Sequence, residues 1–140
     1  GRPGDRHARA LAEQVMQAAG QTVWVEHESD LDVVTALSGS GPAYFFVLAE
    51  LMMQAAIGQG LDPAAARQLA VGTLHGAGAL AHASDGDLAR LRQEVTSKGG
   101  TTEAALGAFA AADLGGILVR AMQAATRRSR ERATEFGKAT

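Results

Sequence analysis

The chain has 140 residues, with 13 lysines and arginines against 15 aspartates and glutamates, and its net charge is −2. This balance gives no general support for a nucleic acid or an anionic membrane as partner. Cysteine is absent, which excludes a disulfide framework and a cysteine-ligated zinc site and fits our expectation of a cytoplasmic protein. The length suits a single domain, and we expect no signal peptide, because no basic-then-apolar leader is evident.

Alanine dominates the composition, whereas aromatic residues make up only 4% and prolines number 3. Because alanine is the best helix former, this composition predicts an all-α protein. Many of the 17 glycines fall inside helical patterns, where each costs about 1 kcal/mol relative to alanine. Glycines at such positions indicate close helix–helix packing.

The first predicted helix covers residues 5–19, in which apolar side chains recur at three- and four-residue spacing. Residues 22–26, with the sequence TVWVE, form the only convincing β-strand pattern in the chain. A single strand cannot pair its own backbone groups, so we expect this one to need a partner from outside the chain.

A short helix is predicted over residues 30–37, followed by a glycine–serine turn at residues 38–42. The next predicted helix, residues 42–59, is apolar almost all round, with Glu50 among its few polar side chains. We expect its apolar stretch to be too short for a membrane span. A helix that is apolar all round must be buried on every side, which predicts the core of a dimer.

Another helix is predicted over residues 63–83, with Asp62 as its cap. His75 and His82 lie seven residues apart on one of its faces. Because no further ligands lie nearby, we expect no metal site there. A short helix follows over residues 88–95.

Residues 95–106 combine a loop that has two adjacent glycines with the start of an amphipathic helix. We expect Thr101 or Thr102 to cap this helix. The open backbone amides, with Lys98 beside them, would then form a cradle for a carboxylate or a phosphate. The alternative is an ordinary turn and cap, which is the commoner meaning of such a loop.

The last predicted helix follows a cap at Asp113 and carries a basic cluster near its end. The cluster consists of Arg127, Arg128, Arg130 and Arg132. No aromatic residues are interleaved with these arginines, so a solvated face is favoured over a nucleic-acid patch. We expect residues 133–140 to fray.

Standard catalytic arrangements are missing from the sequence. No nucleophile is paired with a histidine in a recognisable frame, no paired carboxylates stand out, and neither GxGxxG nor a P-loop occurs. Two glycine–hydroxyl loops remain, at residues 38–42 and 97–102. They suit the binding of a small anionic substrate, whereas difficult chemistry would need a cofactor held elsewhere.

Two segments together closely resemble motifs of the pyrroline-5-carboxylate reductase family: residues 31–44, LDVVTALSGSGPAY, and residues 95–102, VTSKGGTT. The similarity extends over about residues 20–132. It implies an all-α, interlocked helical bundle of the 6-phosphogluconate-dehydrogenase C-terminal-like type, with one short N-terminal strand left from a Rossmann domain.

The resemblance also implies a division of the chain. Residues 1–28 would be a remnant of the dinucleotide-binding domain, its last helix and strand. Residues 29–135 would form a helical dimerisation and substrate-binding domain, and residues 136–140 a tail.

The activity that the resemblance implies is reduction of 1-pyrroline-5-carboxylate to L-proline with NADPH or NADH, the last step of proline biosynthesis. Since the dinucleotide domain is absent from the sequence, we expect the isolated chain to bind no cofactor and to be inactive. The implied partner is a second copy, in a homodimer often built into a ring of dimers (a decamer). The implied ligand is a small imino acid, with neither nucleic acid nor membrane as partner.

By motif position, the resemblance implies substrate contacts from Val95, Ser97, Gly100, Thr101 and Thr102. Thr35 and Ser38 would face the nicotinamide or the substrate from the partner subunit. The resemblance implies no acid, base or metal ligand among them. Lys98 departs from the family, in which many members have proline.

Two alternatives remain at this level. The chain could be a non-enzymatic helical dimerisation module, in which the glycine loops are close-packing turns. It could also belong to a related helical-domain dehydrogenase that acts on a different acid.

Overall fold

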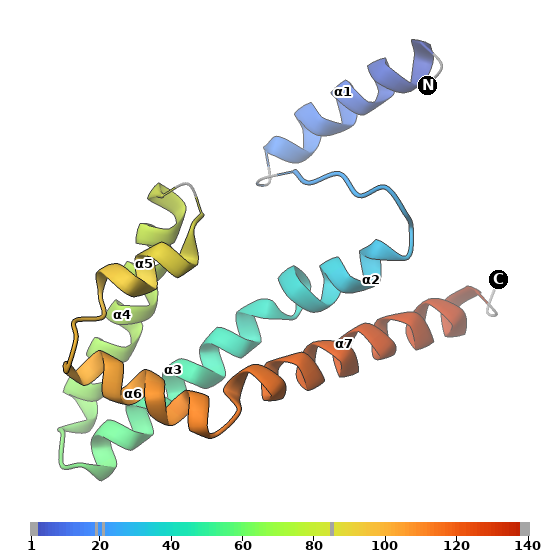
Figure 1. Cartoon of the computed structure of the whole chain (residues 1–140). Coiled ribbons are helices and arrows are strands. Elements are labelled where there is room, and N and C mark those ends of the chain that lie inside the picture. The colour runs from blue at the N-terminus through green and yellow to red at the C-terminus, as the bar shows by residue number, and fades with distance from the viewer. Residues whose placement is uncertain (1–2, 19, 21, 85, 138–140) are drawn as a thin grey trace. The chain divides into compact units, whose positions relative to one another are not determined.

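The computed structural model describes residues 3–18, 20, 22–84 and 86–137, and every regular element within them is a helix (Figure 1). The elements are α1 (Pro3–Gln17), α2 (Asp30–Val34), the π-helix η1 (Thr35–Gly39), α3 (Gly41–Gly58), α4 (Pro63–Ala83), α5 (Leu88–Glu94), α6 (Thr101–Ala111) and α7 (Leu114–Gly137). The all-α prediction is therefore confirmed. The chain forms two compact units, residues 1–31 and residues 32–140.

The first unit contains α1 and a segment, residues 22–25, that has no regular secondary structure. The strand predicted at residues 22–26 does not form within the described chain, because a strand needs a second backbone to pair with and none of the described residues supplies one. Its pairing with a partner from outside the chain stays a prediction. A cation–π contact holds the segment against α1 instead, with the Arg9 guanidinium 4.5 Å from the centre of the Trp24 ring. Residue 19, the predicted end of the first helix, lies outside the described residues.

One continuous helical run passes from α2 through η1 to α3. The turn predicted at residues 38–42 is wrong, because the chain widens into a π-helix there and does not leave the helix. Pro42 gives the reason: in a regular α-helix its ring would clash with the carbonyl of Ser38, and it has no N–H to donate. In η1 the Ser40 N–H donates to the carbonyl of Thr35, five residues back, at 2.9 Å.

α3 and α4 form an antiparallel pair joined by a short connection (Figure 1). Gly60 in this connection has a φ of +98°, a conformation that glycine adopts without steric cost. Asp62 caps α4, since its carboxylate accepts from the N–H of Ala65 at 3.0 Å, and Pro63 takes the first helical position. The predicted start of this helix is thereby confirmed.

α6 and α7 are bent by 58° at the short break between them. Asp113 lies at this break with a φ of +56°, and it is the only non-glycine residue of the described chain with a positive φ. Its carboxylate accepts from the N–H of Gly116 at 3.1 Å, which confirms the predicted cap. α7 continues to Gly137, so the prediction that the chain frays from residue 133 places the end of the helix too early. Residues 138–140 lie outside the described chain.

Part of the basic end of α7 is paired within the helix. Arg128 donates to the carboxylates of Glu131 and Glu135, each at 3.0 Å, and these hydrogen bonds raise the pKa of Arg128. All three side chains are more than half exposed. This is the arrangement of a solvated face, and the absence of a nucleic-acid partner stays a prediction.

Few side chains are buried in the chain taken alone. Within the described residues the buried apolar core consists of Ala36 and Ala66, whereas Phe45 is 59% exposed and Phe46 is 63% exposed. The helical run Asp30–Gly58 is long and apolar enough to cross a membrane, and α6 with α7 passes the same test as one bent span. The prediction that this helix is too short is therefore wrong on length. Such an apolar composition does not distinguish a membrane span from a helix that a second copy of the chain buries.

Candidate functional site

The connection between α5 and α6 carries most of the predicted substrate contacts, and local hydrogen bonds fix its start. Asp87 caps α5 by accepting from the N–H of Arg90 at 2.9 Å. Val95 is the C-terminal cap residue of α5, and its side chain is 63% exposed. The hydroxyl of Thr96 donates to the carbonyl of Arg92 at 2.6 Å, which ties the start of the connection to the last turn of α5.

A tight turn occupies residues 97–100. The N–H of Gly100 donates to the carbonyl of Ser97 at 3.0 Å, and Gly99, third in the turn, has a φ of +72°. A positive φ at the third residue alone is typical of a type II turn, which favours glycine there and proline at the second position, held here by Lys98. A β-carbon at residue 100 would collide with the hydroxyl of Ser97. The turn therefore favours glycine at residue 99 for its φ, and a side chain at residue 100 would require the Ser97 hydroxyl to move.

The predicted threonine cap of α6 is wrong. α6 begins at Thr101, and its cap residue is Gly100, which has no side chain to donate or accept. Thr101 and Thr102 occupy the first two helical positions, whereas a capping hydroxyl belongs one residue earlier. Glu103 reaches back in their place, and its carboxylate accepts from the N–H of Gly99 at 2.7 Å. Neither threonine hydroxyl makes a hydrogen bond to any described residue.

Charges of both signs surround this helix end. Lys98 stands three residues before α6 in the sequence, and the first-turn amides of this helix carry the positive end of its dipole. The carboxylate of Glu103 lies at the same end and is hydrogen-bonded to the loop backbone. A bound anion would be attracted by the amides and Lys98 and repelled by Glu103. The arrangement therefore favours a ligand anchored by hydrogen bonds from amides and hydroxyls over one held by charge alone.

Thr35 and Ser38 lie on η1, which packs against α3 and α7. The hydroxyl of Ser38 donates to the carbonyl of Val34 at 2.9 Å. Figure 1 shows the helical run between α2 and α3 well separated from the α5–α6 connection. One chain does not bring the two predicted groups together, and their meeting across a dimer stays a prediction.

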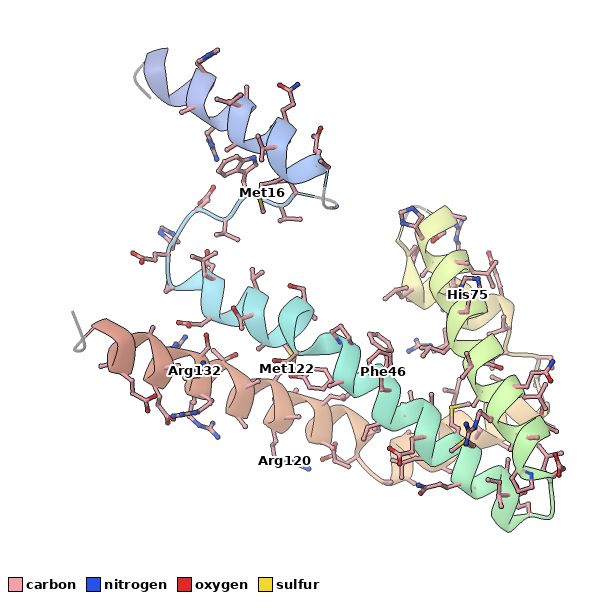
Figure 2. The ribbon with its side chains drawn as sticks, turned by 180° about the vertical axis from the view of Figure 1, so that it is seen from behind. Met16, Phe46, His75, Arg120, Met122 and Arg132 are labelled. Carbon is pink, nitrogen blue, oxygen red and sulfur yellow. The ribbon has the colours of Figure 1, made fainter. Side chains whose placement is uncertain are left out.

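Asp32 makes contacts that the sequence did not predict. Its side chain is 20% exposed, and its carboxylate accepts from the hydroxyl of Ser129 at 2.7 Å and lies 3.4 Å from Nε of Arg130. These contacts join α2 to α7, which runs alongside it (Figure 2). Asp32 and Ser129 are 97 residues apart, so no local pattern could have paired them.

A groove of about 640 Å³ opens between α3 and α4, next to η1 and the start of α5. Its lining is mainly apolar. The larger lining side chains are Leu37, Phe45, Phe46, Leu74 and Leu88. Figure 2 shows Phe46 projecting from α3 on the side that faces α4. Ser38 also lines the groove, which places one predicted site residue on this apolar surface.

No group of three histidines, aspartates or glutamates within the described part of the chain could hold a metal ion. His75 and His82 both lie on α4, and neither belongs to such a group among the described residues. The absence of a metal site stays a prediction.

Comparison with known proteins gives a consistent family. The family model for pyrroline-5-carboxylate reductase dimerisation matches residues 28–132. The pyrroline-5-carboxylate reductase of Vibrio alginolyticus is 44% identical over 126 residues, which cover 89% of this chain and 46% of the relative. That of Pseudomonas aeruginosa is 42% identical over 126 residues, which cover 90% of this chain and 46% of the relative. The chain spans about half the length of these relatives.

Solved structures give the same result. A pyrroline-5-carboxylate reductase from Coxiella burnetii superposes with a TM-score of 0.84 at 38% identity, covering 89% of this chain and 46% of that one. A pyrroline carboxylate reductase from Plasmodium falciparum with NADP bound superposes with a TM-score of 0.75 at 25% identity, covering 88% of this chain and 47% of that one.

Proposed function

This chain belongs to the pyrroline-5-carboxylate reductase dimerisation family, and we propose that it is the dimerising and substrate-binding part of an enzyme that reduces 1-pyrroline-5-carboxylate to L-proline. The chain spans about half the length of its relatives, so a separate part supplies the dinucleotide site. NADPH or NADH is the proposed cofactor, in keeping with the NADP-bound relative. The isolated chain would bind neither.

The α5–α6 connection is the observation that carries this proposal. It joins a rigid glycine turn to a helix end at which no described side chain caps the amides and two threonine hydroxyls have no described partner. We assign the substrate carboxylate to these amides and to Thr101 and Thr102, close to Gly100. Ser97 and the exposed side chain of Val95 would contact the ring of the substrate.

Reduction of a cyclic imine demands little acid–base chemistry from the protein, because the imine nitrogen is readily protonated in water. The reduced dinucleotide supplies the hydride. The residues of this chain have to hold the imine carbon in line with it, and such orientation can lower a barrier by roughly 7–11 kcal/mol. Anchoring the carboxylate at α6 fixes one end of the substrate. Thr35 and Ser38 of a partner copy would face the other side.

A homodimer would complete this site and cover the apolar surface of α3. Removal of apolar surface from water contributes about 25 cal/mol per Å², and α3 with the neighbouring groove offers a large exposed area of this kind. We propose that a second copy, and not a membrane, covers α3, and that dimers assemble further into a ring.

The test joins this chain to the cofactor domain of the Vibrio alginolyticus relative. We expect the fusion to oxidise NADPH in the presence of 1-pyrroline-5-carboxylate and the chain alone to be inactive. A fusion that dimerises and binds NADPH without turnover would contradict the proposal. Turnover by the chain alone would contradict it as well, because the chain would then need no separate dinucleotide site.

A further inference from the structure

A tyrosine hydroxyl from α3 reaches back to the π-helix. Tyr44 donates to the carbonyl of Ala36, eight residues earlier, at 3.0 Å, and Ala36 is fully buried, with 0% of its surface exposed. In an α-helix this carbonyl would accept from the amide of residue 40, but the Ser40 N–H donates to Thr35 instead. Tyr44 therefore satisfies a buried carbonyl that the change of register separates from its usual partner.

The register of η1 decides which way its side chains face. Each residue of an α-helix turns the chain by about 100° about the helix axis. The extra residue in the π-turn thus rotates Thr35 and Ser38 by roughly that angle relative to α3, compared with an uninterrupted α-helix. Single π-turns within α-helices are frequent at functional sites.

The other end of the same segment is fixed on α7. The carboxylate of Asp32 accepts from Ser129 at 2.7 Å and lies 3.4 Å from Nε of Arg130. The helical run is therefore anchored before η1 by α7 and after η1 by the hydroxyl of Tyr44. A segment held at both ends cannot relax by unwinding from a free end, so loss of one anchor should act on the register itself.

We infer that Tyr44 is a positioning residue, whose hydroxyl holds η1 in the π-register and thereby sets the orientation of Thr35 and Ser38. The inference rests on the proposed function, because it concerns the two residues proposed to face the nicotinamide or the substrate. Tyr44 acts through the backbone of η1, to which its hydroxyl is hydrogen-bonded.

The first part of the test uses the chain itself and Tyr44→Phe, which removes only the hydroxyl. We expect the Ser40 amide to exchange about fivefold faster, the effect of losing one net hydrogen bond, and the backbone chemical shifts of residues 35–40 to move. Gln59→Ala is the matched control, because it removes a side-chain donor to a carbonyl, at 3.2 Å, at the other end of α3. If residues 35–40 are unchanged in Tyr44→Phe, the inference is overturned.

The second part uses the fusion with the cofactor domain. We expect Tyr44→Phe to lower kcat/KM about tenfold while the dimer stays as in Gln59→Ala. A merely structural role predicts the reverse, a weaker dimer with unchanged kcat per folded dimer. A shifted register with unchanged kcat/KM would overturn the positioning role alone. An inactive unsubstituted fusion would overturn the proposed function and the positioning role with it, whatever the register measurements show.

Discussion

Lys98 occupies the second position of the type II turn, where proline is favoured. Its amide makes no hydrogen bond to any described residue, so the missing N–H of a proline removes no contact. Lys98→Pro should stabilise the chain by about 0.5 kcal/mol, since proline lowers the entropy of the unfolded chain, and raise the melting temperature by about 2 °C. Thermal unfolding at one fixed protein concentration checks this. Lys98→Ala is the control, because it removes the same charge without adding the proline ring, and its melting temperature should not rise. A melting temperature of Lys98→Pro below that of the unsubstituted chain would argue against a type II turn.

Thr102 tests the proposed anchor for the substrate carboxylate. A hydrogen bond to a charged group contributes about 1.5–3 kcal/mol, so Thr102→Ala in the fusion should lower kcat/KM for 1-pyrroline-5-carboxylate about tenfold or more. Thr134→Ala is the matched control: it makes the same substitution on α7, where the hydroxyl donates to the carbonyl of Arg130 at 3.0 Å. Equal kcat/KM in the two variants would remove Thr102 from the site.

At the level of the elements, the bend between α6 and α7 depends on Asp113. This residue combines a φ of +56° with a carboxylate that caps α7 through Gly116. Asp113→Ala loses the cap, at about 1 kcal/mol, and replaces a residue whose short polar side chain tolerates the left-handed region with one that does not, at about 1 kcal/mol more. Urea unfolding should therefore show a loss of about 2 kcal/mol. Asp113→Asn keeps both the acceptor and the tolerance of this conformation, so equal losses in the two variants would exclude the cap as the cause.

The elements also show which features of the fold can be predicted from neighbouring residues in the sequence. The caps at Asp62 and Asp113 were predictable, because a cap is decided within three residues. The register change before Pro42 was not, since the same glycine–serine pattern suits a turn, and the hydrogen bond from Tyr44 that supports the π-register joins residues eight apart. The two adjacent threonines predicted a hydroxyl cap for α6. The helix begins at Thr101, however, so the cap position belongs to Gly100, which has no side chain. The contacts of Asp32 depend on tertiary packing alone.

At the scale of the whole molecule, the chain buries too little apolar surface to account for its own folding. Ordering each residue costs roughly 1–2 kcal/mol in backbone entropy, whereas the buried apolar core of the described residues consists of Ala36 and Ala66. The sequence did predict that α3 needs burial by a second copy, since the helix predicted over residues 42–59 is apolar almost all round. A second copy that covers α3 would supply the missing burial, so we expect folding and dimerisation to be coupled.

Phe46 is the side chain through which this coupling can be tested. It lies on α3, is 63% exposed in the single chain and lines the apolar groove toward α4. In a dimer that covers this groove, Phe46→Asp would bury two unpaired carboxylates, at a cost of about 3 kcal/mol or more, so the dissociation constant should rise at least a hundredfold. Sedimentation velocity measures the dimer.

The melting temperature of the unsubstituted chain should rise with protein concentration, because dimerisation stabilises only the folded form. Phe46→Asp should lose that dependence together with helical circular dichroism. Val23→Asp is the control, since it places the same charge on a side chain that is 80% exposed in the other compact unit. A Phe46→Asp chain that sediments as a dimer would place the interface elsewhere, because a dimer that buries this groove cannot accept the charge.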